Sequence, residues 1–386
     1  MKKWFMLLLP LTFIGSLWAQ EAPSPFLAGE LPAAQKIEKV LSAGNPSDVL
    51  LLAAAPQKMV GLAGFKMASK GGKLFPVQQQ ALPTIGKIAG KGSTLSAEKI
   101  VALQPNLIID VGNVAPNYID QAKRTFAQTG VPYLLLDGRL AETPKTLREL
   151  GKLLGMETFT EPQAQYAEET LKSAVDFAGV LQQTAYLARS ADGLQTGQKG
   201  SIHTEAMELV GLRNVVEGEH KGLTQVSMEQ LLLWNPDIIL TQYAEFFQTI
   251  KDNPQWQQLS AVKNQRVFFI PNQPFGWLDS PPGLNRLLGV RWLQHLLSNK
   301  SMNDFCARSA TVFINCSTTL IYRKHKRSSC YRDNNAKSYP PRATPVLFIA
   351  DGDFSRQYFT CPERGEISRF TKSIMANARL FREFTM

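Results

Sequence analysis

Two stretches of the chain, residues 95–109 and 226–240, repeat one pattern of apolar and polar positions. Each has an apolar residue, a serine, a glutamate two positions later, an apolar run with helical spacing, a proline and a second apolar run. A serine hydroxyl caps the start of a helix, a proline ends it, and a short apolar run after it is typical of a buried strand. A helix–strand unit that occurs twice predicts two lobes of like construction with a cleft between them.

The same alternation of helical and strand patterns continues through most of the chain. We expect strands at residues 39–43, 59–63, 133–136, 184–188 and 265–270, helices at 49–55, 117–129, 160–183, 205–211 and 283–297, and loops at 193–200 and 272–282. Strands that alternate with helices indicate parallel sheets with helical crossovers. The predicted fold class is therefore α/β, with two Rossmann-like lobes joined by a single long helix and a ligand cleft between them.

Two of the expected helices begin with residues that are typical of helix starts. Asn45 is placed to act as an N-cap with Pro46 at the first helical position. Thr160 and Gln163 have the spacing of a capping box. The helix that follows Thr160 would extend about 35 Å at 1.5 Å per residue. It falls midway between the two repeated units, so we expect it to join the lobes.

These patterns also divide the chain into segments. We expect an N-terminal lobe at residues 36–158, an interlobe helix at 159–183 and a C-terminal lobe at 184–298. Residues 1–19 have a basic start, an apolar run and a small residue at Ala19, which predicts a secretory signal peptide. The apolar run is well short of the ~20 residues that a transmembrane helix needs. We therefore expect an exported, periplasmic protein.

The charge of the chain is concentrated in its last segment. The formal net charge is +10, but residues 301–386 hold 14 of the 42 Lys and Arg and 7 of the 32 Asp and Glu. The first 300 residues are therefore close to balanced, which argues against nucleic-acid binding by the main body. All four cysteines lie in the same tail, where apolar periodicity fades. We expect this tail to be a disordered extension; a basic arm for nucleic acid or a membrane surface is the alternative.

The order of these pieces resembles a known family over about residues 36–297. The stretches that carry the resemblance are 95–109, 193–197, 211–216, 226–240, 261–267, 274–277 and 281–289. They resemble the periplasmic substrate-binding proteins of ABC importers, in the class that serves ferric siderophores, cobalamin, haem and, in some members, molybdate or tungstate. The resemblance implies a monomer that holds a ligand between two lobes and delivers it to an inner-membrane permease with its ATPase.

The resemblance gives a role to the glutamate of each repeated unit. In such proteins one exposed glutamate on each lobe docks onto basic residues of the permease, and Glu98 and Glu229 match these positions. The alternative is that both glutamates only complement the helix dipole, which contributes ~0.3–1 kcal/mol each.

Candidate ligand contacts in the N-terminal lobe lie where strands end. Asn45 and Pro46 start a helix whose free N–H groups suit an anionic oxygen, although an ordinary capped helix explains them equally well. Lys66 and Lys87, with Lys91, lie in glycine-bearing loops and are able to neutralise an anion. Solvated surface lysines are the alternative. Tyr118 follows the strand of the first repeated unit, where it flanks the cleft or packs.

Candidate contacts in the C-terminal lobe follow the same logic. Arg189 follows a strand, and its planar guanidinium suits a carboxylate or an oxyanion. Tyr243 follows the strand of the second repeated unit, and Phe275 and Trp277 form an aromatic wall or pack in the core.

The sequence favours a carrier over an enzyme or a metalloprotein. It has no Gly-x-Ser-x-Gly, P-loop or His-Glu-x-x-His motif, so we assign no catalytic residue and no cofactor, and a secreted hydrolase is the distant rival. His203, His220 and His295 do not form a metal set with nearby carboxylates. Ferric siderophore is the first expected ligand, as the commonest cargo of the resembling class. Molybdate or tungstate comes next, and cobalamin or haem after that.

Overall fold

The computed structural model describes residues 25–298, apart from 69–71, 73, 74, 91, 180, 181 and 219–221. The predicted signal peptide, the basic tail with its cysteines, Lys91 and His220 lie outside the described residues.

The N-terminal lobe is built on a four-stranded sheet in the order β1-β4-β3-β2. Its strands are β1 (Phe26–Ala28), β2 (Val40–Ser42), β3 (Leu107–Gly112) and β4 (Tyr133–Asp137), and only β1 is antiparallel to its neighbour. Successive side chains of a strand point to opposite faces, and β3 is buried on both. Leu107 and Ile109 pack against α1 (Asn45–Ala54) and α5 (Thr143–Leu154). Ile108 packs against α3 (Ala97–Leu103) and α4 (Pro116–Thr129).

The C-terminal lobe has a second four-stranded sheet, wholly parallel, in the order β10-β9-β5-β7. Its strands are β5 (Thr184–Ala188), β7 (Arg213–Asn214), β9 (Ile238–Thr241) and β10 (Val267–Phe269), beside a small antiparallel pair, β6 (Gln195–Gly197) and β8 (Leu223–Gln225). One face packs against α7 (Glu205–Leu209) and α11 (Arg286–Leu297). The other face packs against α8 (Met228–Trp234), α9 (Ala244–Thr249) and α10 (Ser260–Lys263).

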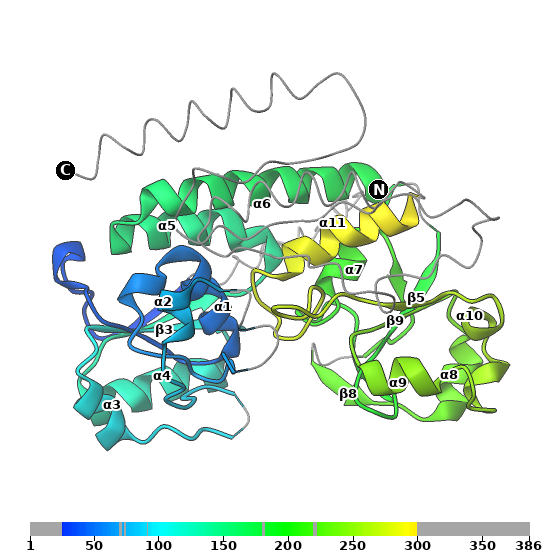
Figure 1. The fold of residues 1–386 in the computed structure, drawn as a ribbon, viewed down its shortest axis with the longest axis horizontal. Helices are drawn as coiled ribbons and strands as arrows, with labels where there is room; N and C mark the ends of the chain where they lie inside the picture. Colours follow the sequence, from blue (N-terminus) through cyan, green and yellow to red (C-terminus); the bar gives the residue numbers. More distant parts are fainter. Residues whose placement is uncertain are drawn as a thin grey trace, which may run out of the picture. The chain divides into compact units, whose positions relative to one another are not determined.

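One long helix, α6 (Glu157–Ala178), joins the lobes. It contacts α1 and α5 of the N-terminal lobe and α7 and α11 of the C-terminal lobe, and Figure 1 shows it passing both. The predicted fold class is confirmed. The remaining elements are a short helix, α2 (Val77–Gln80), and 3-10 turns at Ala34–Lys36, Pro56–Lys58, Leu140–Glu142 and Trp256–Gln258.

The start of α6 differs from the sequence prediction. The helix begins at Glu157, and Thr160 is 1% exposed inside it, so the predicted capping box is wrong. The reason is α5, a helix that the sequence analysis did not expect. Gly155 ends α5 in the left-handed conformation, with φ +65°, and the chain turns directly into α6.

The two repeated units fold as the pattern predicts. The Ser96 hydroxyl accepts the Lys99 amide at the start of α3, and the Ser227 hydroxyl accepts the Gln230 amide at the start of α8. The Gln230 side chain also accepts the Ser227 amide, which completes a capping box in the second unit. Each helix is followed by one left-handed C-cap residue, which directly precedes the proline.

Three local predictions need correction. Helix α1 begins at Asn45, so Gly44 and not Asn45 is the N-cap. Residues 59–63 form two isolated bridges and no strand, because the Leu62 amide and carbonyl bond to Pro83 and Ile85, outside the sheet. The loop expected at 193–200 contains β6, which pairs with β8. The sequence analysis also did not expect the strand β1.

Candidate ligand-binding site

A cavity of about 360 Å³ lies between the two lobes. The N-terminal lobe contributes Asn45 and Val49 of α1 and residues 64–66. The C-terminal lobe contributes residues that follow β9 and residues of the loop before α11: Gln242, Tyr243, Asn272, Pro274, Phe275, Gly276, Ser280 and Pro281. The chain segments after β2 and β9 thus meet at the cavity, and the carboxyl ends of parallel strands are where open α/β sheets bind ligands.

The N-terminal wall is fixed by the buried carboxylate of Asp48, in the first turn of α1. Its oxygens accept the backbone amides of Ala63 at 2.8 Å, Gly64 at 2.9 Å and Phe65 at 3.0 Å. Burial raises the pKa of Asp48, while the hydrogen bonds to it act in the opposite direction. Residue 64 has no room for a side chain, because a Cβ on Gly64 would lie 2.1 Å from Asn45 Oδ1. Helix and loop are therefore held in one arrangement.

An aromatic cluster crosses from one lobe to the other. Phe65 and Phe75 belong to the N-terminal lobe, and Phe275 belongs to the loop before α11. The ring centroid of Phe275 lies 5.0 Å from that of Phe65 and 5.6 Å from that of Phe75, in edge-to-face geometry. Phe275 is thus packed in the core of the opposite lobe and also lines the cavity.

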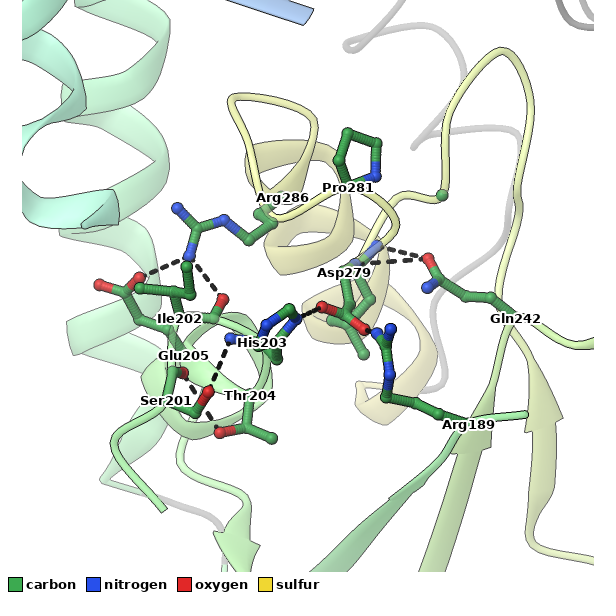
Figure 2. A network of polar contacts seen from close by, with 12 residues as sticks. Arg189, Ser201, Ile202, His203, Thr204, Glu205, Gln242, Asp279, Pro281 and Arg286 are labelled. Carbon is green, nitrogen blue, oxygen red and sulfur yellow. Dashed lines mark hydrogen bonds and ion pairs between the residues drawn. The ribbon is translucent and has the colours of Figure 1, made fainter. Parts of the chain in front are cut away.

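The C-terminal wall rests on a buried polar network, which Figure 2 shows. The Gln242 side-chain oxygen accepts the backbone amides of Leu278 at 3.0 Å and Asp279 at 3.4 Å. The Asp279 carboxylate is fully buried and pairs with Arg189 and with His203 Nδ1. Burial, followed by the charges of Arg189 and Arg286, lowers the pKa of His203 to about 3. The imidazole is therefore neutral, and its Nδ1–H donates to Asp279.

A second part of the network connects the lobes directly. Arg286, 1% exposed at the start of α11, donates to the Glu205 carboxylate and the Ile202 carbonyl, both at 2.7 Å. It also donates to the carbonyl of Gly138, just after β4 of the N-terminal lobe. Glu205 accepts the Leu140 amide at 2.9 Å. Burial lowers the pKa of Arg286 and raises that of Glu205, and their opposite charges act against both shifts.

The cavity is suited to an anion. Among the described residues that line it there is no carboxylate, and the exposed Lys66 is the only charged one. Asn45, Tyr243 and Ser280 add amide and hydroxyl donors. Among the described residues no group of three or more His, Cys, Asp or Glu is placed to hold a metal ion. The arrangement provides donors and aromatic faces for binding.

The predicted contacts are only partly brought together. Asn45, Lys66 and Tyr243 line the cavity. Pro46 lies beside it, with its carbonyl 3.5 Å from the position of a Cβ on Gly283. The Lys87 side chain lies close to Gly64, since a Cβ built on this glycine would be 3.4 Å from Lys87 Cδ.

The other predicted contacts are not among the residues that line the cavity. Tyr118 belongs to α4 and packs, half-buried, against the core between this helix and the sheet. Arg189 is paired with Asp279. Trp277 packs against the C-terminal core, and its indole N–H donates to Gln273 at 3.0 Å. Sequence reasoning missed Phe65, Gln242, Asn272 and Ser280. Gln242 directly follows β9, so the rule that ligand contacts lie at strand ends, which pointed to Tyr243, predicts Gln242 as well.

Glu98 and Glu229 occupy equivalent, fully exposed positions in the first turns of α3 and α8. A hydrogen bond to the Ser96 hydroxyl lowers the pKa of Glu98, and a hydrogen bond to its own backbone amide lowers the pKa of Glu229, so both are ionised at neutral pH. An apolar side chain is exposed one turn later on each helix. Val101 is 51% exposed and Leu233 is 85% exposed.

A larger hollow, of about 570 Å³, lies over α5 and α6. Several of its charged groups are paired, since Arg148 contacts Glu168 at 2.5 Å and Lys145 contacts Glu149 at 3.9 Å. The hollow is open to solvent and away from the strand ends, so we do not regard it as the ligand site. Within the described part of the chain no helix has the length and apolar character needed to cross a membrane.

Comparisons with known proteins agree with this architecture. A model of the periplasmic binding protein family matches residues 43–274. The molybdate-binding protein MolA of Haemophilus influenzae is 26% identical over 276 residues, which covers 64% of this chain and 74% of MolA. The vitamin B12-binding protein of Salmonella typhi is 25% identical over 51% of this chain and 69% of its own length. The solved structure of an ABC transporter solute-binding protein from Sulfurospirillum deleyianum has a TM-score of 0.67 at 24% identity, covering 75% of this chain and 91% of its own.

Proposed function

Because the chain belongs to the periplasmic binding protein family, we propose that it captures an anionic ligand between its lobes in the periplasm and delivers it to an ABC permease with its ATPase. The observation that carries this proposal is the cavity, whose described lining residues are Lys66, neutral donors and apolar groups, with no carboxylate among them. These described residues offer groups that bind a ligand and no nucleophile paired with a base, which favours binding without turnover.

Molybdate or tungstate is the first ligand class. Such an oxyanion needs several hydrogen-bond donors and little else, and Lys66, Asn45 and Tyr243 supply donors of three kinds. The relative from Haemophilus influenzae, which is named for molybdate, supports this choice. We therefore rank the oxyanion ahead of the siderophore, which the sequence alone ranked first.

An anionic iron chelate, such as a ferric siderophore, is the second candidate. The rings of Phe65 and Phe275 give the cavity an apolar side that a bare oxyanion does not use. The volume of about 360 Å³ is roughly twelve times the ~30 Å³ that one water occupies in the liquid. A chelate fills that space better. Cobalamin and haem remain further alternatives, the first supported by the vitamin B12-binding relative.

Titration calorimetry of the purified protein tests the ligand class. The titrants are sodium molybdate, sodium tungstate, sodium sulfate and a panel of ferric siderophores. We expect Lys66→Met to weaken anion binding about tenfold, because it removes a charged donor. The matched control Lys145→Met, on the distant exposed face of α5, should leave affinity unchanged. Equal affinities for wild type and Lys66→Met, or heat from none of the anions, would contradict the proposal.

Docking through Glu98 and Glu229 is tested separately, in cells that depend on this carrier for uptake. The double substitution to alanine should abolish uptake and leave ligand affinity intact. Glu157 and Glu245 provide the control pair, since both are exposed glutamates in the first turn of other helices. Uptake that survives the first pair, or fails equally with the second, would refute the docking role.

A further inference from the structure

The loop between β10 and α11 supplies much of the cavity. Asn272, Pro274, Phe275, Gly276, Ser280 and Pro281 all line it. The loop has no regular secondary structure between Ile270 and Asn285, and its Gln273–Pro274 and Ser280–Pro281 peptide bonds are cis. Because the loop lacks regular secondary structure, its shape depends on side-chain and backbone contacts with the rest of the protein.

Asp279 makes the charged contacts among them. It lies in the loop and is 1% exposed, and it does not line the cavity. Its carboxylate pairs with Arg189, the residue directly after β5, and with His203, two residues before α7. Its own amide is held by Gln242, directly after β9. Figure 2 shows Asp279 lying between these three side chains.

The chemistry of the three partners requires a carboxylate at this position. Arg189 donates only, and neutral His203 donates through Nδ1, so two donors face one acceptor group. An asparagine would present an NH2 group to one of them. Removing the negative charge would also leave the buried guanidinium of Arg189 without its counter-ion, which is strongly destabilising.

We propose that Asp279 is a positioning residue for the cavity and that it orders the 272–281 loop by binding Arg189 and His203. In this arrangement Arg189 is a structural partner of Asp279 and does not contact the ligand. The inference rests on the proposed function, because the loop matters to binding only if the cavity holds the ligand. It also assigns Arg189 a different role from the one that its sequence position suggests.

Asp279→Asn tests the proposal, with Asp237→Asn as the matched control. Asp237 also connects β5 and β9, but at the opposite ends of these strands, where it accepts the Thr184 amide and hydroxyl at 2.8 Å. Hydrogen exchange followed by mass spectrometry reports on peptides that span 271–285. We expect Asp279→Asn to speed exchange in these peptides and weaken molybdate or ferric-siderophore binding by about tenfold or more, since loss of one charged hydrogen bond has that effect. Asp237→Asn should change neither.

A triple variant separates positioning from ligand contact. Arg189→Met, His203→Leu and Asp279→Leu together replace the buried polar group by apolar side chains, which proteins often tolerate because no buried donor is left without an acceptor. If Arg189 only holds the loop, this variant should show slow hydrogen exchange in the 271–285 peptides and near wild-type affinity for the ligand. Slow exchange with lost affinity would show that Arg189 touches the ligand and would overturn the proposal, as would unchanged exchange in Asp279→Asn. If wild type binds none of the titrants, the proposed function fails, while exchange still decides whether Asp279 orders the loop.

Discussion

Substitution of Asp48 by asparagine is the sharpest test of how the N-terminal wall is held. The wild-type carboxylate accepts three backbone amides, from Ala63, Gly64 and Phe65, at 2.8–3.0 Å. Asparagine has nearly the same shape but only one oxygen. If that oxygen stays with Ala63, the new NH2 group faces the amides of Gly64 and Phe65, and both lose their acceptor.

The magnitude follows from these two amides. A buried N–H without an acceptor costs ~1–3 kcal/mol, so the pair costs ~2–6 kcal/mol. Burial raises the pKa of Asp48, which shows that the ionised carboxyl is itself disfavoured there, so a neutral side chain recovers part of the cost. We expect the free energy of unfolding to fall by about 2–4 kcal/mol.

Urea denaturation of the full chain at pH 7, followed by circular dichroism, gives this difference directly. Asp120→Asn is the control, because Asp120 is an exposed residue of α4. Molybdate affinity should fall as well, since Phe65 and Lys66 follow the released amides. A loss of stability no larger than that of the control would refute the reasoning.

Three further predictions concern other parts of the molecule. The folded pKa of His203, about 3, lies below the ordinary value of ~6.5, so the unfolded chain carries an extra proton between these values. The free energy of unfolding should therefore rise with pH there, by up to ~1.4 kcal/mol per unit, and His203→Asn should flatten that slope in denaturation curves at pH 4.5, 5.5 and 6.5. Phe275→Ala should lower the free energy of unfolding by about 3–5 kcal/mol, because it empties an aromatic site in the opposite core; a fall below ~1 kcal/mol in urea would contradict that packing. Leu233→Asp should reduce uptake like Glu229→Ala and leave ligand affinity unchanged, and undiminished uptake would remove Leu233 from the docking face.

Short-range signals explain what the sequence predicted correctly. Ser96 and Ser227 cap their helices through bonds that span three residues, so the repeated units were readable from local spacing. The two-lobed fold followed from that repetition. Thr160 failed for the opposite reason, because the preceding helix α5 and its turn at Gly155 decide where α6 begins.

The candidate site also shows that local spacing does not reveal contacts made only by the folded chain. Asn45, Lys66 and Tyr243 line the cavity, and the sequence pointed to them because each lies just beyond a strand or in the loop that follows. Arg189 satisfied the same rule, yet its counter-ion Asp279 is 90 positions away in the sequence. Spacing along the chain gives no sign of a pair that only the folded loop brings together.

The carboxylates of Asp48 and Asp279 lie behind the walls of the cavity and do not line it. The residues that shape the walls are therefore different from those that meet the cargo. Lys66 and Ser280 are exposed, and substitution there leaves the supporting hydrogen bonds in place. Evolution or an engineer is thus free to change cargo preference at the lining while thermal tolerance is maintained by the layer beneath it.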